Sequence, residues 1–371
     1  MELQPGLPDI SRVLRNTDLM KIFLCDRETA SRIQIGLGQL DTNFESGAAI
    51  LDDVIDKYQW KWVKLRLFDT EPDNLLSMTD YLLVKRNSRV AQATSKVFLD
   101  AFMVEPTTTS QNRLTPVVMK VFKNGISRKV LFYETIINIL IDFYTRGNDT
   151  ILAPKIFRVG KVRMGSTKSV IIQEYIKADE LRKIDRLDYM VAALKRCCMG
   201  FDWLYRSLRF SHRDFHGENV MYDVYHDRII FIDFGYSCLT LPNTEGSIQI
   251  KKNLYGWDLE SGPSLVSCRN RSHDICTLLL ALYRQNKKFR AIFAPLCLDI
   301  CNAYRNEILK MPNAQNFIEE IKDSLSYKEP VIDEPGVFHF WYTYELYSIE
   351  LEAYTPENIY KILNTYNPFK F

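Results

Sequence analysis

Residues 212–219 read His212-Arg213-Asp214-Phe215-His216-Gly217-Glu218-Asn219, and Asp233-Phe234-Gly235 begins fourteen positions after Asn219. Phosphoryl transfer requires a carboxylate near the acceptor hydroxyl and oxygen ligands for the magnesium ion that bridges the phosphates. Asp214 suits the first task as a catalytic base, and Asn219 with Asp233 suits the second. The order and spacing of these motifs therefore predict a phosphoryl-transfer site.

The residues between the two motifs predict a strand, a turn and a second strand. Val220 to Val224 favour a short strand, Tyr225 to Asp227 a polar turn, and Arg228 to Ile232 a β-branched strand that ends at Asp233. A chance match inside a buried hairpin is the alternative, and the joint occurrence of both motifs in this context argues against it.

A lysine interrupts an apolar run upstream, Val117-Val118-Met119-Lys120-Val121-Phe122. A lysine on an apolar strand is costly unless it is paired, and the expected partner is Glu134, on the amphipathic stretch from Arg128 to Tyr144. In phosphoryl transfer such a lysine holds the α- and β-phosphates and the glutamate orients it. The alternatives are an edge-strand lysine that faces solvent and an ordinary surface glutamate on a helix.

Together these motifs resemble the eukaryotic-like protein kinase superfamily, from about residue 80 to about residue 300. The resemblance implies ATP as substrate, Mg²⁺ as cofactor and an α+β, two-lobed fold. It implies an N-terminal extension at 1–78, a small, mainly β lobe at 79–176 and a large, mainly α lobe at 177–371. Ser272-His273-Asp274-Ile275 is similar to the start of the large lobe's central helix, where Asp274 would tie the catalytic-loop backbone together. An aspartate there also suits a helix N-cap.

The resemblance extends to the nucleotide site, with one departure. Val170 to Ile176 favour a buried strand that runs into a polar segment, where the backbone of Glu174 and Ile176 would bind adenine at the hinge; another core strand is the alternative. The phosphate-binding loop would include Ala91, Ala93, Ser95 and Val97, where the family has glycines at the first three positions. Glycine lets backbone approach phosphate closely, so small residues here imply a stiffer or more distant loop.

Two features narrow the resemblance. His216 stands where common serine/threonine kinases have lysine, and no Ala-Pro-Glu occurs between Gly235 and Asp274. The chain is similar in this to haspin-like kinases, to kinases of large DNA viruses and to small-molecule kinases of the aminoglycoside and choline type. A serine/threonine protein kinase is the preferred prediction; a small-molecule kinase and a pseudokinase that serves as a binding module are the alternatives. Arg213 could pair with an activation-loop phosphate or form a structural ion pair.

The amino-acid composition limits the classes of partner and the cellular compartment that we expect for this protein. The 371 residues are 46% hydrophobic with a net charge of +2, which predicts no bulk attraction to nucleic acid or to an anionic membrane. No apolar run reaches the ~20 residues of a membrane span, and the first residues show no signal pattern. Eight dispersed cysteines and five histidines argue against zinc and predict buried free thiols in a reducing compartment. We expect a cytoplasmic or nuclear protein that acts on a protein substrate. If the protein is viral, we expect it in the host cell or in the virion.

Overall fold

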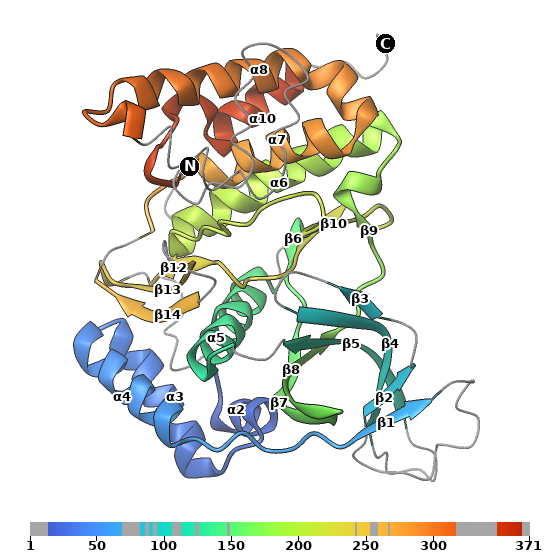
Figure 1. Ribbon diagram of the computed structural model, residues 1–371, viewed down its shortest axis with the longest axis vertical. Coiled ribbons are helices and arrows are strands. Elements are labelled where there is room, and N and C mark those ends of the chain that lie inside the picture. The colour runs from blue at the N-terminus through green and yellow to red at the C-terminus, as the bar shows by residue number, and fades with distance from the viewer. Residues whose placement is uncertain are drawn as a thin grey trace. The chain divides into compact units, whose positions relative to one another are not determined.

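The computed structural model describes residues 14–68, 82–85, 89–91, 95–105, 113–122, 126–146, 149–241, 243–252, 259–265, 268–316 and 347–365. The chain divides into two compact units (Figure 1). Unit 1 comprises residues 1–143, 154–177 and 241–265, and unit 2 comprises residues 144–153, 178–240 and 266–371. The chain therefore returns to unit 1 after the D-F-G motif. The lobe boundaries expected from the sequence stay a prediction.

Unit 1 contains a seven-stranded sheet in the order β1-β2-β4-β5-β8-β7, with β3 paired to β4. Its strands are β1 (Leu65–Phe68), β2 (Leu82–Lys85), β3 (Arg89–Ala91), β4 (Ser95–Glu105), β5 (Arg113–Phe122), β7 (Ile156–Met164) and β8 (Ser166–Glu174). A parallel bridge between Trp62 and Lys161 joins the segment before β1 to the β7 edge. Apolar residues of these strands, among them Val84, Met119 and Ile172, form a buried cluster that also includes Val63.

The N-terminal extension packs within unit 1. It forms α2 (Asn16–Phe23), α3 (Arg27–Leu40) and α4 (Phe44–Lys57), and Asp26 and Asn43 cap the last two through their side chains. The next helix of unit 1 is α5 (Arg128–Thr145), where Phe132 lies 5.2 Å from Phe23 between ring centroids. This unit also holds the hairpin of β13 (Ser247–Lys252) and β14 (Leu259–Ser264). The extension thus shares the apolar interior of the β-rich unit.

Unit 2 is mainly helical. Its longer helices within the described residues, labelled in Figure 1, are α6 (Leu187–Leu208), α7 (His273–Gln285), α8 (Lys287–Leu309) and α10 (Pro356–Thr365). Short 3₁₀ helices occur at η1 (Leu181–Lys183) and η3 (Glu352–Tyr354). A small sheet has the order β6-β11-β10-β9, with β6 (Ile151–Leu152), β9 (Asp179–Glu180), β10 (Val220–Asp223) and β11 (Arg228–Phe231), and β12 (Cys238–Thr240) follows along the chain. A β-rich unit and a mainly helical unit confirm the predicted α+β, two-lobed kinase-like fold.

The local fold around the two motifs is as predicted. β10 and β11 pair antiparallel, and Val220 lies opposite Phe231. The Asp223 carboxylate accepts hydrogen bonds from the backbone amides of Tyr225 and His226, at 3.1 and 3.2 Å, which closes the turn. The second strand therefore leads directly into Asp233.

The prediction that all eight cysteines are free thiols is wrong for two of them. Cys238 on β12 and Cys268 form a disulfide, with Cα atoms 6.0 Å apart. Their separation of 30 residues hid this pairing from the sequence, because only the fold brings the two thiols within bonding geometry. The other six cysteines are free and buried. Among the described residues, no helix is both long and apolar enough to cross a lipid bilayer.

Candidate active site

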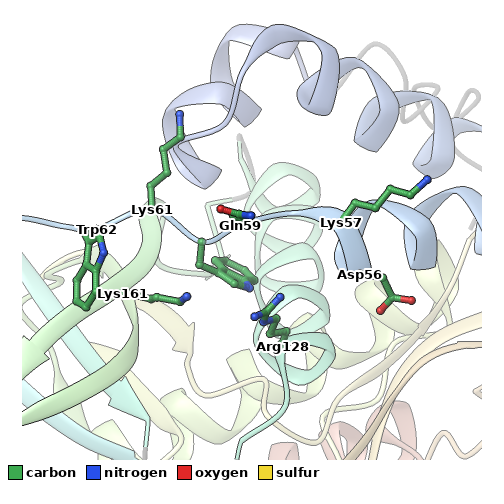
Figure 2. A pocket seen from close by; sticks show the side chains of 8 residues that line it. Asp56, Lys57, Gln59, Lys61, Trp62, Arg128 and Lys161 are labelled. Atoms are coloured by element: carbon green, nitrogen blue, oxygen red, sulfur yellow. The ribbon is translucent and has the colours of Figure 1, made fainter.

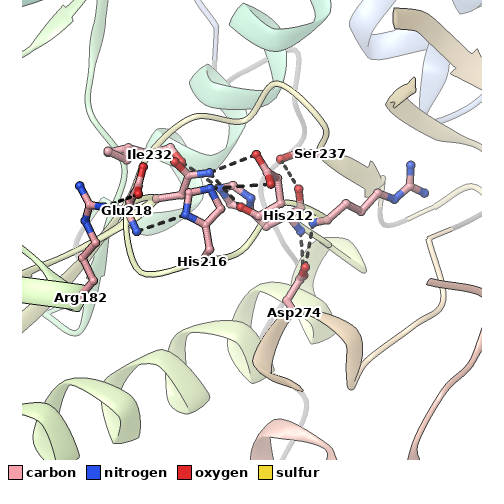
Figure 3. A network of polar contacts seen from close by, with 10 residues as sticks. Arg182, His212, His216, Glu218, Ile232, Ser237 and Asp274 are labelled. Carbon is pink, nitrogen blue, oxygen red and sulfur yellow. Dashed lines mark hydrogen bonds and ion pairs between the residues drawn. The ribbon is translucent and has the colours of Figure 1, made fainter. Parts of the chain in front are cut away.

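Polar contacts join the residues of the catalytic loop, and Figure 3 shows His212, His216 and Glu218 within this network. The Asn219 side chain donates through Nδ2 to the backbone oxygen of Asp214 at 2.8 Å and to its Oδ2 at 3.3 Å. Nε2 of His216 lies 3.8 Å from the other carboxylate oxygen. Because Nδ1 of His216 accepts a hydrogen bond from the Glu218 amide at 3.3 Å, the neutral ring carries its proton on Nε2, toward Asp214. The Asn219 amide thus holds one oxygen of the carboxylate, and the imidazole of His216 lies beside the other.

Asp274 holds the backbone that leads into Asp214. Its Oδ1 accepts from the Arg213 amide at 2.7 Å, and its Oδ2 accepts from the His212 amide at 2.7 Å and from the Ser211 hydroxyl at 2.9 Å. Asp274 lies in the first turn of α7 and is 5% exposed. Burial raises the pKa of the Asp274 carboxyl to about 6, against the three hydrogen bonds that favour its charged form. The role implied by the resemblance, a tie for the catalytic-loop backbone, matches these contacts.

His212 is a buried, neutral support for the same loop. Its Nε2 lies 2.9 Å from the backbone oxygen of Ile232, so the residue before Asp233 is joined to the catalytic loop. Its ring lies 5.2 Å from Phe215 and 5.5 Å from Phe234, both fully buried. Burial lowers the pKa of His212 to about 4. His212 is therefore uncharged near neutral pH, as an imidazole among aromatic rings must be.

Lys120 and Glu134 form the ion pair expected between β5 and α5. Lys120 Nζ lies 2.7 Å from Glu134 Oε1, and their side chains are only 6% and 7% exposed. The strand register places Lys120 opposite Val97 on one side and Ile171 on the other. The pair is thus enclosed by apolar strands, and the solvent-facing alternatives for both residues are excluded.

The phosphate-binding loop is only partly described. Ala91 ends β3 and pairs with Lys96, and Ser95 begins β4 opposite Phe122. Val97 is half-buried. Ala93 lies outside the described residues. The structure therefore pairs the two strands that flank the loop with each other, and β4, the second of them, also pairs with the Lys120 strand β5.

The hinge candidates follow β8. The Glu174 amide donates to the backbone oxygen of Lys155 at 2.8 Å, and β8 pairs Glu174 with Val117. Ile176 lies beyond the strand, and within the described ranges no hydrogen bond joins its backbone to another residue. The Ile176 backbone is consequently the better placed of the two to bind a nucleotide base.

Sequence reasoning missed three contributors to this site. Ser211 hydrogen-bonds Asp274, and its place directly before the motif was the available signal. Gly217 passes close to η1, since a side-chain carbon there would meet Arg182 Cβ at 2.9 Å, and its place inside the motif marked it. The Arg213 guanidinium lies 4.3 Å from the ring centroid of Tyr347, a residue that no motif marked. This cation–π contact gives Arg213 a structural role, and both predicted roles, pairing with an activation-loop phosphate and a structural ion pair, stay predictions.

The residues present fit a magnesium ion. Both Nδ2 hydrogens of Asn219 are directed at Asp214, which leaves the amide oxygen Oδ1 for a cation. Asp233 adds a carboxylate on a left-handed backbone, with φ at 62°, an unusual conformation that aims its side chain. Hard Mg²⁺ takes oxygen ligands of this kind and keeps several waters and phosphate oxygens in its shell.

Comparison with known proteins supports this chemistry. Residues 168–261 match the model of the phosphotransferase enzyme family, less than half of the chain. The matched segment contains the hinge, the whole catalytic loop and the D-F-G motif. A search of curated proteins found no match. The match and the site support a phosphotransferase with a kinase-like fold, and the finer resemblance to haspin-like and large-DNA-virus kinases stays a prediction.

Proposed function

We propose that the chain is an ATP- and Mg²⁺-dependent kinase that transfers the γ-phosphate to a serine or threonine hydroxyl of a protein. The observation that carries this proposal is the buried ion pair between Lys120 and Glu134. A buried pair adds little net stability compared with apolar residues, so a fold alone gives no reason to keep one. Phosphoryl transfer does, because the lysine must be held against the nucleotide phosphates.

Each side chain has a role in this proposal. Lys120 binds the α- and β-phosphates, and Glu134 keeps its ammonium group in place. Asp214 orients the acceptor hydroxyl and takes its proton as the oxygen attacks the γ-phosphorus. Asn219 and Asp233 would hold the metal, which supplies charge neutralisation at the phosphates when bound. The Nε2 proton of His216 faces Asp214 and can donate to a phosphate oxygen there.

A second candidate is a small-molecule kinase of the aminoglycoside or choline type. The family match over residues 168–261 and the imidazole of His216 beside Asp214 favour it. The same groups would perform the same transfer in both cases, because acceptor choice depends on what lies beyond Asp214 and not on the catalytic loop. Substrate panels therefore separate the two candidates, whereas active-site variants do not.

Labelled ATP with Mg²⁺ tests the function. The wild type, Asp214→Asn and Asp233→Ala are incubated with generic protein substrates and, separately, with aminoglycosides and choline. We expect label on protein from the wild type and at least about a thousandfold less from either variant. The matched control Asp299→Ala removes an exposed aspartate of α8 and should retain activity.

Each outcome has a distinct meaning. Label on a small molecule but not on protein would favour the second candidate. If Asp214→Asn transferred phosphate at the wild-type rate, the assignment of the catalytic base would be wrong. ATP binding without transfer to any acceptor would indicate the pseudokinase alternative.

A further inference from the structure

Unit 1 carries a hollow whose lining is strongly basic (Figure 2). Its volume is about 730 Å³, and its lining residues are Asp56, Lys57, Gln59, Trp60, Lys61, Trp62, Arg128 and Lys161. Four of these residues are cationic and one is acidic. The lining thus has three more cationic than acidic residues, whereas the whole chain has a net charge of only +2. A hollow of this size exceeds a single anionic group and falls within the range of ligand sites.

Backbone pairing fixes the cations in place. The Lys161 amide donates to the Lys61 carbonyl at 2.9 Å, and the Val63 amide donates to the Lys161 carbonyl at 2.8 Å. These bonds hold Lys61, Trp62 and Lys161 next to one another on two neighbouring segments. Such preorganisation lowers the entropy lost when a ligand binds.

Arg128 adds a third segment to the lining. It is the first residue of α5, where the helix dipole is positive, and its side chain is exposed. Lys57 is joined to Asp53 at 2.7 Å, and Lys61 lies near enough to Asp26 to lower the pKa of that carboxyl, after the hydrogen bonds from Thr29. No ion pair within the described ranges involves Arg128 or Lys161. Those two cations are consequently the ones most able to bind an external anion.

Two tryptophan indoles line the hollow, and they differ in exposure. Trp62 is 56% exposed, which is unusual for a large aromatic side chain and typical of interface residues. Trp60 is 5% exposed, and its Nε1 has no hydrogen-bond acceptor in the described part of the chain.

We propose that this hollow is a docking site for an acidic peptide segment of a protein partner. Carboxylates of the segment would face Arg128 and Lys161, and an apolar side chain would pack on Trp62. A peptide fits better than a lone anion because the site combines separated cations and an exposed indole in one hollow. The site is independent of the phosphotransfer residues, none of which lines it.

Binding of a labelled peptide of glutamate and leucine to the whole chain tests the proposal, with the glutamine analogue as the reference. We expect saturable binding of the acidic peptide that weakens with ionic strength, and no binding of the analogue. Arg128→Glu and Lys161→Glu should each weaken binding about tenfold, since a reversal replaces attraction by repulsion. Trp62→Ala should weaken it as well. The urea midpoints of these variants should equal that of the wild type.

The control is Lys287→Glu, which makes the same charge change at the exposed start of α8. Equal weakening by this control would overturn the proposal, because the effect would then be one of net charge. Absence of peptide binding would also overturn it, as would binding to phosphatidylserine vesicles in place of the peptide. The assay needs no ATP, and Asp214→Asn should bind the peptide as the wild type does, so failure of the proposed phosphotransfer would leave this result intact.

Discussion

Breaking the buried ion pair of unit 1 from one side should cost far more stability than removing it whole. Glu134→Gln removes the carboxylate that pairs with Lys120, a residue only 4% exposed, and removing one partner of a buried ion pair costs about 3–5 kcal/mol. Replacing both partners, in Lys120→Met with Glu134→Leu, removes both charges from the buried interior of unit 1. The double variant should therefore be as stable as the wild type or more stable, by up to about 4 kcal/mol.

Urea unfolding of the wild type, Glu134→Gln and the double variant measures this difference, with Asp100→Asn as the control. Asp100 pairs with Lys85 at 3.7 Å, but both side chains are about half exposed, so its loss should change stability by less than about 1 kcal/mol. Phosphate transfer should be lost in both pair variants. A double variant that is as unstable as Glu134→Gln would refute the reasoning. The ion pair between Lys120 and Glu134 would then stabilise the fold, and its presence would be no argument for nucleotide binding.

Three further predictions concern unit 2. Asp274→Ala leaves three donors of the catalytic-loop segment without their acceptor and should slow phosphate transfer, with nucleotide affinity nearly unchanged; equal rates for variant and wild type would contradict this. Cys238→Ser removes the disulfide with Cys268, and because this bond closes a loop of 30 residues, the free energy of unfolding should fall by about 3–4 kcal/mol. A reductant should destabilise the wild type but leave the stability of the variant unchanged. Burial lowers the pKa of His212 to about 4 and the pKa of His273 to about 3. Because the folded protein keeps both rings neutral, their contribution to folding stability is complete above about pH 6.5 and is lost as the pH falls toward 4. The raised pKa of Asp274 acts in the opposite direction, because its protonated form stabilises the fold between about pH 4 and 6. Urea unfolding at several pH values should show that His273→Gln loses less stability on acidification than the wild type. An equal loss in both proteins would contradict a neutral, buried His273.

The sequence could predict the catalytic segment because its chemistry and its local structure use the same residues. Asp214, Asn219 and Asp233 are required in a fixed order, and the strands between the motifs have a clear apolar pattern. Lys120 stood out for a related reason, since a charge within an apolar strand needs a partner nearby. The structure supplies that partner at the predicted position, Glu134, one helix later.

Other features depend on contacts that a linear pattern does not carry. The packing of the extension rests on contacts such as Phe23 with Phe132, more than a hundred residues away. The return of residues 241–265 to unit 1 has no signal in composition. The stacking of Arg213 on Tyr347 joins a motif residue to the C-terminal part of the chain, where aromatic residues are too frequent for one to be singled out.

Backbone conformation gives a final argument that this segment is adapted to a reaction. Arg213 and Asp233 both have left-handed backbones, with φ at 63° and 62°, a conformation that costs a non-glycine residue roughly 1 kcal/mol or more. Each is held by neighbours: the Arg213 amide donates to Asp274, and the residue before Asp233 is tied to His212 and to the Asn219 carbonyl. Arg213 directly precedes Asp214, the proposed base, and Asp233 is itself a proposed metal ligand. The buried side chains of Asp274 and His212 hold the two strained positions. Stability alone would favour relaxed backbone and apolar support, so the arrangement is best explained by the need to aim two carboxylates.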